Sequence, residues 1–360
     1  MLISALIAFA TAFVLIHRLI RIAPRIGLVD VPNGRSMHST ATPRGAGIGI
    51  FIALIAAIFI AEPGVVRSYP LTIIAFFIVF LIGLLDDHKD ASPHTKFGII
   101  IIGTVLCYLE GIGIHSFGRF FGFELSLGLL ALPFTLFAVS GFTNALNLVD
   151  GLDGLAGSIS LVILAVLFYL GYTHDDLFIT AISSSLMAAI AAFLFFNWKP
   201  AKIFLGDSGS LTIGFIISIL SIKALDYFNP TLVLFIAGVP ILDTLIVMIR
   251  RKRHGRSAFE ADKTHLHHIL LKFFNGNVKR TVISLTLMQA ILSVTGIFIM
   301  YDTEQTFVLM LFAANYTILF ISASAMLANQ RRMQRLKQKL ETLKKLQRGN
   351  VVCQEDDAVR

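Results

Sequence analysis

The stretch NALNLVDGLDGLAG, residues 144–157, decides how the rest of this chain is interpreted, because it sets polar groups between two long apolar runs. Glycines at positions 151, 154 and 157 favour a break at which the backbone approaches a ligand closely. A plain polar turn accounts for these glycines, but not for the regular spacing of two amides and two acids. Helical geometry would bring residues spaced by three near one face, and here these are Asn144, Asn147, Asp150 and Asp153.

The rest of the chain is strongly apolar. Of its 360 residues, 56% are hydrophobic and only 14% are charged, and the mean hydropathy is +0.80. These are the values of a polytopic membrane protein, for which one helical bundle is expected. Cys107 lies in an apolar run and Cys353 in the polar tail, which argues against a disulfide and a thiol-ligated metal. The net charge of +8 then reflects membrane topology, not nucleic acid binding.

Apolar runs long enough to cross a bilayer, about 20 residues, predict an all-α polytopic membrane protein with a bundle of about eleven transmembrane helices. The first run lacks a basic start and a cleavage site, so it is interpreted as a retained anchor and not as a signal peptide. The predicted spans are 1–20, 46–62, 69–85, 97–110, 125–146, 155–172, 177–196, 209–227, 230–249, 281–300 and 306–328.

Basic residues predict the orientation of these spans. All but three of the 30 Lys and Arg residues fall in segments that follow odd-numbered spans, and the exceptions are Arg67, Arg119 and Lys223. The positive-inside rule assigns those segments to the cytoplasm, so the N-terminus lies outside and the C-terminus is cytoplasmic. We therefore predict a transmembrane catalytic domain over 1–328 and a basic cytoplasmic tail, partly an amphipathic helix, over 329–360. The cytoplasmic loops that would carry the site are 23–45, 86–96, 147–155, 197–208 and 250–280.

A pair of adjacent acids, Asp86 and Asp87, ends the third span. Adjacent carboxylates repel, so they are stable together mainly when they share a cation or a proton. Acids at a helix C-terminus also oppose the macrodipole. Because Mg²⁺ prefers a few carboxylates plus phosphate oxygens, the pair indicates a metal site, and a solvated helix end is the alternative. Lys96 follows closely and is placed to meet a phosphate as a point charge.

Single acids occur near two further span ends. Asp207 lies in FLGDSGSL, residues 204–211, where the N–H groups of the following helix would face an anion. It is interpreted as a helix N-cap or as a metal ligand beside the other acids. Asp243 lies inside an apolar run, where a lone acid is costly, so it pairs with a basic residue of the next loop or orients substrate.

The longest internal polar segment, residues 250–280, contains His265, His267 and His268. No Cys or Glu partner for zinc sits at the standard spacing. Imidazoles beside a run of basic residues fit a diphosphate better. Arg44, in the first cytoplasmic loop, is interpreted as a phosphate ligand or as a marker of topology.

Taken together, these clusters resemble the polyprenyl-phosphate N-acetylhexosamine-1-phosphate transferase family (glycosyltransferase 4 family) over about residues 27–271, with every motif in family order. The sequence ADKTHLHH, residues 261–268, is similar to the branch that starts cell-envelope glycans from UDP-N-acetylglucosamine. The branch that uses UDP-MurNAc-pentapeptide usually shows three consecutive histidines. Residues 32–47 also resemble relatives that transfer other N-acetylated sugars, so the sugar stays open.

The resemblance implies that undecaprenyl phosphate and a UDP-N-acetylhexosamine give undecaprenyl-diphosphate-sugar and UMP, with Mg²⁺ or Mn²⁺ as the cofactor. It places the protein in the bacterial cytoplasmic (inner) membrane, in contact with membrane lipid, and leaves a homodimer open. The roles fall into overlapping sets. The catalytic set is Asp86, Asp87, Asp150, Asp153, His265, His267 and His268. The substrate-binding set is Lys96, Asn144, Asn147, Asp243 and Arg44. The metal set is Asp207, Asn147, Asp86 and Asp87.

A membrane transporter is the alternative class, because polar residues in broken helices also build substrate pathways. Transporter sites lie near the middle of the membrane, however, whereas these clusters are predicted at one face. A membrane scaffold would leave the acids without a role. Release of UMP that depends on polyprenyl phosphate and Mg²⁺ discriminates between the enzyme and both alternatives.

Overall fold

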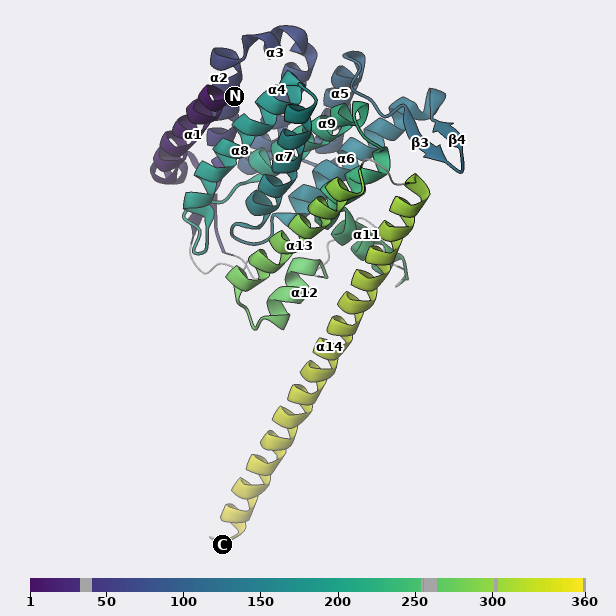
Figure 1. Ribbon diagram of the computed structural model, residues 1–360. Coiled ribbons are helices and arrows are strands. Elements are labelled where there is room, and N and C mark those ends of the chain that lie inside the picture. Colours follow the sequence, from purple (N-terminus) through teal and green to yellow (C-terminus); the bar gives the residue numbers. More distant parts are fainter. Residues whose placement is uncertain (33–40, 254, 256–263, 301–303, 359–360) are drawn as a thin grey trace.

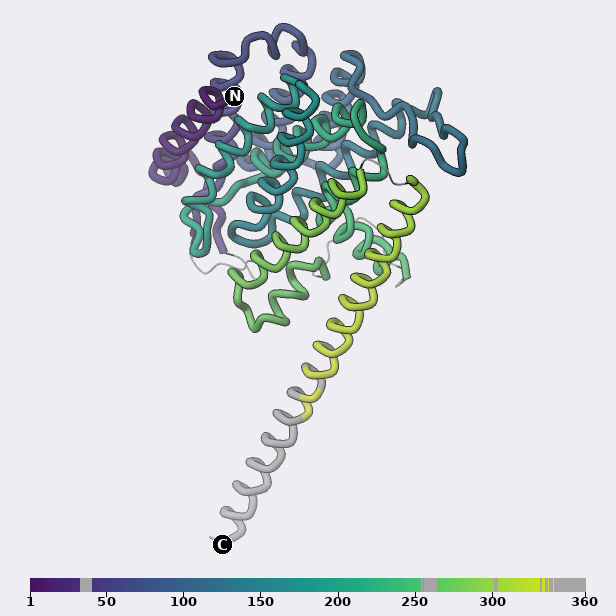
Figure 2. Tube along the Cα trace, in the orientation of Figure 1, coloured from purple at the N-terminus to yellow at the C-terminus, as the bar shows by residue number. Residues whose placement is uncertain are grey.

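The computed structural model describes residues 1–32, 41–253, 255, 264–300 and 304–358, and it folds almost entirely into helices (Figure 1). The chain runs back and forth between the two ends of a bundle (Figure 2). The helices are α1 (Leu2–Ile22), α2 (Ala46–Ala61), α3 (Pro63–Ser68), α4 (Pro70–Lys89), α5 (Pro93–Leu109), α6 (Ala131–Val149), α7 (Leu155–Thr173), α8 (Leu177–Asn197), α9 (Asp207–Lys223), α10 (Val233–Ile236), α11 (Gly238–Arg253), α12 (Leu266–Phe273), α13 (Val278–Phe298) and α14 (Gln305–Ala358). Short 3₁₀ turns are η1 (Ala23–Ile26), η2 (Gly128–Leu130), η3 (Ala224–Asp226) and η4 (Pro230–Leu232).

The helices bear out a multi-pass membrane protein. Within the described residues, 8 helices are long and apolar enough to cross a bilayer, and α2 and α5 are shorter apolar helices. The structure differs from the prediction over residues 230–249. Instead of one straight helix, α10 and α11 meet at 89° and form one broken span or a re-entrant segment. Each of the other predicted spans falls on one apolar helix. The last helix, α14, continues without interruption past residue 328, so the predicted start of the tail is not a helix end.

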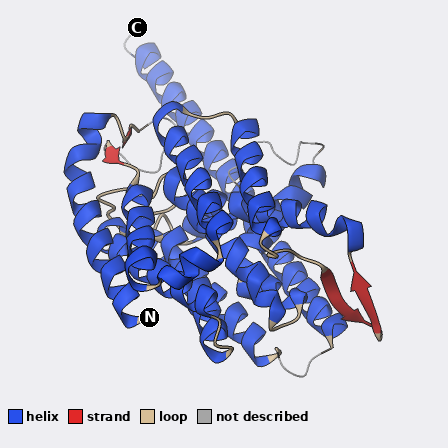
Figure 3. Cartoon of the chain, turned by 90° about the horizontal axis from the view of Figure 1, so that it is seen from above, coloured by secondary structure: helices blue, strands red, loops and turns tan. Residues whose placement is uncertain are grey.

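Two small antiparallel pairs of strands lie on opposite sides of the bundle (Figure 3), and the sequence did not predict them. One pair is β1 (Val29–Asp30) with β2 (Thr42–Pro43), and the other is β3 (Ser116–Phe120) with β4 (Phe123–Ser126). The first pair is tied to the chain before α9, because Phe204 N donates to Pro43 O at 2.8 Å. It therefore brings the neighbouring residue Arg44 to the start of α9.

Helix α9 is the most buried span, with 89% of its apolar window inside the protein. It is surrounded by α2, α4, α6 and α7. Glycines allow the closest contacts at its start: a Cβ added to Gly47 would lie 2.2 Å from Gly209 N, and one added to Gly83 would lie 2.6 Å from Asp207 O. The backbone that carries Asp207 is therefore held tightly between α2 and α4.

The N-terminus lies at the end of the bundle opposite to the start of α9. The ammonium group of Met1 pairs with Glu62 at 3.1 Å, beside the end of α2. At the other end of α2, Ala46 N donates to Phe204 O at 3.1 Å. The two ends of the molecule can therefore be told apart by their contacts. The long α14 packs against α12 and extends away from the bundle (Figure 1).

Candidate active site

The acid pair at the end of α4 has two different roles in the structure. Asp87 is 2% exposed, and its carboxylate covers the first turn of α9. It accepts from Asp207 N at 2.8 Å, from Ser208 N at 3.1 Å and from Ser208 Oγ at 2.5 Å. The first N–H groups of a helix have no partner within the helix, so Asp87 satisfies them from a neighbouring span and fixes the position of Asp207.

Asp86 points to a lysine instead. Lys96 Nζ lies 3.0 Å from Asp86 Oδ2 and 3.1 Å from Asp207 Oδ2, so it joins the two carboxylates. The other oxygen of Asp86 accepts from Ala91 N at 2.7 Å, which holds the turn after α4. Asp86 is buried, but Lys96 and Asp207 are only partly screened from solvent, with exposed side-chain fractions of 24% and 29%. The cation is therefore accessible from the same side as the Asp207 carboxylate.

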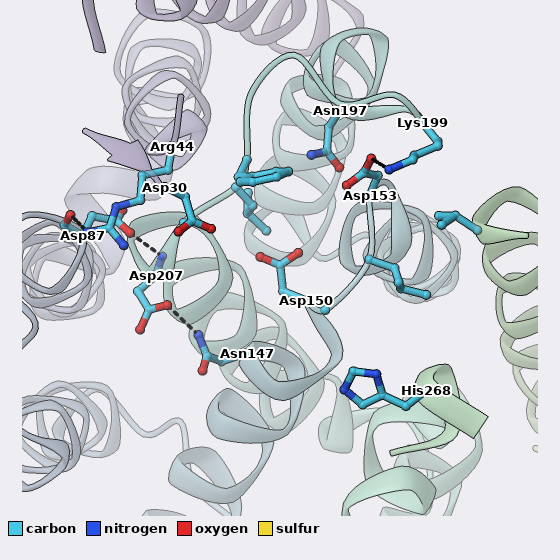
Figure 4. Close-up of a pocket in the computed structure, with 16 residues that line it drawn as sticks. Asp30, Arg44, Asp87, Asn147, Asp150, Asp153, Asn197, Lys199, Asp207 and His268 are labelled. Atoms are coloured by element: carbon cyan, nitrogen blue, oxygen red, sulfur yellow. Dashed lines mark hydrogen bonds and ion pairs between the residues drawn. The ribbon is translucent and has the colours of Figure 1, made fainter. Parts of the chain in front are cut away.

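The last turn of α6 reaches the same carboxylate. Asn147 Nδ2 donates to Asp207 Oδ1 at 3.2 Å and to Ser210 Oγ at 2.8 Å. Figure 4 shows Asn147 and Asp207 pointing toward each other across the start of α9. Residues from α4, α5, α6 and α9, up to 121 positions apart in sequence, thus converge on Asp207. Asn144, one turn earlier on α6, is half-buried and does not line the cavity described next.

A cavity of about 410 Å³ opens beside Asp207. Seven of the predicted site residues line it (Figure 4): Arg44, Asp87, Asn147, Asp150, Asp153, Asp207 and His268. The other predicted site residues stand behind this wall or away from it: Asp86, Lys96, Asn144, Asp243, His265 and His267. Each of the five loops predicted to carry the site therefore contributes at least one residue to this cavity.

The predicted break between α6 and α7 is present, and two glycines explain it. Gly154 has a φ of +82°, a left-handed conformation that glycine adopts without strain. Gly151 lies against a histidine, because a Cβ added there would be 2.4 Å from His267 Nε2. The break turns the chain so that Asp150 and Asp153 both face the cavity.

Asp150 lies in this break, outside the helices, and its environment disfavours its charge. Burial, followed by the negative charges of Asp207, Asp87 and Asp153, raises the pKa of Asp150 to about 7. Loss of hydration and nearby like charges both penalise an ionised carboxyl. A cation or a positively charged group bound in the cavity would relieve this repulsion, so the acids around it fit a site for a cation or for a cation-carrying ligand.

Asp153 belongs to a second part of the cavity, which the sequence did not single out. Lys199 Nζ lies 3.1 Å from Asp153 Oδ2, and Ala201 N donates to the same oxygen at 3.1 Å. Asn197 is 5% exposed; it accepts from Gly154 N at 2.7 Å and donates to Ile203 O at 2.8 Å. The missed lining residues are therefore Asp30, Asn197 and Lys199. Their signal was weak, since each is a single polar residue: Asp30 lies in β1, Asn197 is the last residue of α8, and Lys199 follows it in the connection to α9.

The three histidines occupy different environments. Asp243 is 2% exposed and accepts from His265 Nδ1 at 2.8 Å and from Leu266 N at 2.7 Å. It therefore holds the start of α12, where the sequence left a basic partner and a substrate contact as alternatives. Burial and the charge of His268 lower the pKa of His267 to about 3, so His267 packs as a neutral ring. Of the three, His268 lines the cavity.

Arg44 stands on the opposite wall. It donates to the backbone carbonyl of Asp87, and its Nε is buried without a hydrogen-bond acceptor among the described residues. A guanidinium with a buried, unused donor beside a cavity fits an anionic ligand. The loop residues Arg35 and His38 and the part of the histidine segment over 256–263 lie outside the described residues.

No three His, Cys, Asp or Glu side chains in the described parts of the chain are arranged to hold a metal ion by themselves. That arrangement is what a structural zinc site requires. Mg²⁺ differs, because it keeps several waters and binds through one or two carboxylates together with substrate phosphates. The hard oxygen ligands of Asp207 and Asn147 at the cavity edge fit this second mode.

The fold and the cavity define a class: a polytopic helical membrane protein with a site of acids, amides and cations at one end of its bundle, suited to a charged phosphate ligand. Comparison with known sequences specifies it further. The chain belongs to glycosyl transferase family 4, whose model matches residues 69–225.

Several relatives are similar over most of their length. The probable undecaprenyl-phosphate N-acetylglucosaminyl 1-phosphate transferase of Bacillus subtilis is 32% identical, over 75% of this chain and 77% of the relative. The undecaprenyl-phosphate alpha-N-acetylglucosaminyl 1-phosphate transferase of Pasteurella multocida is 31% identical, over 88% and 93%. The decaprenyl-phosphate N-acetylglucosaminephosphotransferase of Mycobacterium tuberculosis is 32% identical, over 73% of each chain. The predicted family is therefore confirmed.

Proposed function

We propose that this protein transfers N-acetylglucosamine-1-phosphate from UDP-N-acetylglucosamine to undecaprenyl phosphate, giving undecaprenyl-diphosphate-N-acetylglucosamine and UMP. The names of the relatives support the donor and the acceptor. The observation that carries the proposal is the position of Asp207, which begins a buried helix at the edge of a cavity. Its carboxylate accepts hydrogen bonds from Lys96 Nζ and Asn147 Nδ2.

The reaction makes one phosphorus–oxygen bond and breaks another. An oxygen of the acceptor phosphate attacks the phosphorus that carries the sugar, and the bond from that phosphorus to the bridging oxygen of the diphosphate breaks, so that UMP leaves with the electron pair. The acceptor is already an anion near neutral pH, and phosphoryl transfer depends mainly on positioning and on neutralising charge. The main requirements on the protein are therefore positive groups that neutralise the phosphates and a rigid site that positions them; a strong base is less important.

Lys96, Arg44 and His268 are suited to the phosphate groups. Lys96 forms ion pairs with Asp207 and Asp86. Arg44 and His268 line the cavity from two sides. Asp150 and Asp153 lie between them, and with Lys199 they would shape the pocket for the nucleotide sugar. Asp87 and Asp243 act on this site indirectly, because their carboxylates hold the starts of α9 and α12.

Asp207 and Asn147 would hold a Mg²⁺ ion, or Mn²⁺ in its place. Such an ion, when bound, neutralises charge on the diphosphate of the donor. Asp86 and Asp87 stay weaker predictions as ligands, because both are buried, at 8% and 2% exposed, whereas the Asp207 side chain is 29% exposed at the cavity edge.

The site would face the cytoplasm of a bacterial inner membrane, with eleven crossings, the N-terminus outside and the C-terminus inside. The distribution of Lys and Arg along the chain supports this orientation, and so does the position of Met1 at the end of the bundle away from the cavity. The isoprenoid acceptor is held in lipid and the nucleotide sugar is in water, so the two can meet only at such a boundary.

The test is release of UMP from UDP-N-acetylglucosamine by detergent-solubilised protein. We expect release only when both undecaprenyl phosphate and Mg²⁺ are present, and we expect the lipid product to carry the labelled sugar. A panel of UDP-sugars in the same assay identifies the donor. Folded protein that releases no UMP with any of them would contradict the proposal and favour the transporter.

A further inference from the structure

The break between α10 and α11 is held by one buried side chain of α13. A bend of 89° removes backbone hydrogen bonds that a continuous helix would make. Gln289 Oε1 accepts from Val239 N at 2.9 Å, and Gln289 Nε2 donates to Ile236 O at 2.7 Å. Gln289 is 0% exposed. Backbone groups inside a membrane need protein partners, and this single amide supplies both the acceptor and the donor.

Helix α13 also approaches the break closely. A Cβ added to Gly238 would lie 2.7 Å from Leu292 Cδ1, so the missing side chain lets α13 pack directly against the break. Ser293 is 1% exposed, and its hydroxyl oxygen lies 2.8 Å from Gln289 Nε2 and 3.3 Å from Ile236 O. The direction in which α11 leaves the break is therefore set by α13 and by the amide at its centre.

Helix α11 in turn carries the acid that holds the histidines. Asp243 lies five residues after Gly238 and fixes both His265 and Leu266 at the start of α12. The chain turns directly into α12, since His268 N donates to His265 O at 3.0 Å, and His268 lines the cavity. A rotation of α11 about the break would move Asp243, then α12, and then the His268 ring.

From this geometry we infer that Gln289 is a positioning residue: it sets the angle of α11 and through Asp243 places His268 at the edge of the cavity. It touches neither substrate, because it lies about 16 Å along α13 from Val278, the residue of that helix that lines the cavity. The inference rests on the proposed function for its consequence in catalysis, but not for its structural part.

A double-mutant cycle tests the catalytic consequence. We expect Gln289→Leu to lower kcat for UMP release by about 10- to 100-fold, because a displacement of about 1 Å far from the chemistry can cost that much. We expect His268→Ala to lower kcat as well, and the double variant to be no slower than His268→Ala alone, since both changes remove the same contribution. Effects that multiply would overturn the inference, as would full activity of folded Gln289→Leu.

Two further variants keep the test interpretable. Gln289→Glu retains the acceptor for Val239 N, and because burial disfavours its charged form the protonated carboxyl can still donate to Ile236 O, so we expect a smaller loss of kcat; it replaces Gln289→Leu if that variant does not fold. Thr295→Val is the matched control on α13, because the Thr295 hydroxyl donates within the helix to Ile291 O at 2.8 Å. We expect it to keep wild-type kcat.

A measurement without turnover separates this inference from the proposed function. His268→Cys is introduced together with Cys353→Ser, which leaves the buried Cys107 as the other thiol, and labelling by a water-soluble maleimide is timed in detergent. We expect Gln289→Leu to change the labelling rate by about threefold or more, as a change in local exposure would, and Thr295→Val to leave it unchanged. An unchanged rate in Gln289→Leu overturns the inference. A changed rate in a protein that never releases UMP sustains it and contradicts the function.

Discussion

At each end of the bundle, one carboxylate accepts hydrogen bonds from the first turn of a neighbouring helix, but the surroundings of the two carboxylates differ. At the end near the cavity, Asp87 accepts from two backbone N–H groups and one hydroxyl at the start of α9. At the other end, Glu110 does the same for α4: it accepts from Leu71 N at 2.7 Å, Thr72 N at 2.8 Å and Thr72 Oγ1 at 2.7 Å. A carboxylate placed over the first turn of a neighbouring helix therefore satisfies backbone N–H groups whether or not it belongs to a catalytic site.

The surroundings make the difference between the two ends. The turn that Asp87 holds begins with a second acid, Asp207, which meets Lys96 and Asn147 beside a cavity. The turn that Glu110 holds begins with Pro70 and Leu71, which offer no charged group. A buried acid in a membrane bundle therefore indicates function only where further ionisable groups converge on it. The predictions that follow compare the two ends directly.

The largest difference is expected in catalysis. Asp207→Asn should lower kcat for UMP release by about 10³-fold, the scale of losing a preorganised charge at a reacting phosphate, while Glu110→Gln should stay within a few-fold of wild type. Both proteins should remain folded and monodisperse in detergent. Normal activity of Asp207→Asn would contradict the role given to this acid.

Removing the two capping acids should separate stability from activity. Asp87→Ala and Glu110→Ala each leave buried N–H groups without an acceptor, and we expect each to lose about 1–3 kcal/mol of stability. Thermal unfolding in detergent measures this loss. We expect Asp87→Ala alone to lower kcat as well, by about 100-fold in the protein that remains folded, because it frees the turn that carries Asp207. Equal losses of kcat in both variants would show that the ends do not differ as described.

Stability near the cavity should depend on pH through His267. Its pKa is lowered to about 3 in the folded protein, from an ordinary value of 6.5. The unfolded chain therefore binds more protons below pH 6.5, so stability is fully present above 6.5 and is lost as the pH falls toward 3. The raised pKa of Asp150 acts in the opposite direction over the same range, so the histidine is isolated by comparing two proteins: we expect the melting temperature of the wild type, measured relative to that of His267→Gln, to fall between pH 6.5 and about 4. An unchanged pH dependence of the melting temperature in His267→Gln would contradict this expectation.

The smallest effect compares two glycines with the same backbone conformation. Gly111 and Gly154 both have a φ of +82°, so alanine at either position should cost about 1 kcal/mol in backbone strain. A Cβ at Gly111 meets nothing within 4 Å, whereas one at Gly154 lies 3.1 Å from the Trp198 ring. We expect a small loss of thermal stability for Gly111→Ala and a somewhat larger one for Gly154→Ala, where the Trp198 ring must also shift, with an added rise in KM for the nucleotide sugar in Gly154→Ala. An unchanged KM would place Gly154 outside the binding pocket.

Several features could be predicted from the sequence because they depend on local composition. Apolar runs have the length that a bilayer requires, so the spans were placed close to their helices, and glycines at 151 and 154 marked the break between α6 and α7. The order of the polar motifs indicated the family. It also led to seven residues that line the cavity, including Asp150 and Asp207.

Tertiary structure alone decided which side chains meet. Helices that are apolar on all sides carry no mark of the face that packs inward, so the sequence did not show that Asp87 covers α9 or that His268 lines the cavity while His267 packs behind it. The sharp bend before α11 and the glutamine that holds it were equally hidden, because their partners lie about 50 residues apart. Residue composition along the chain specifies which segments are long and apolar enough to cross a membrane, since hydration of each residue type governs that. The rotations of the helices around α9, which depend on contacts between distant segments, turned those polar ends into one site.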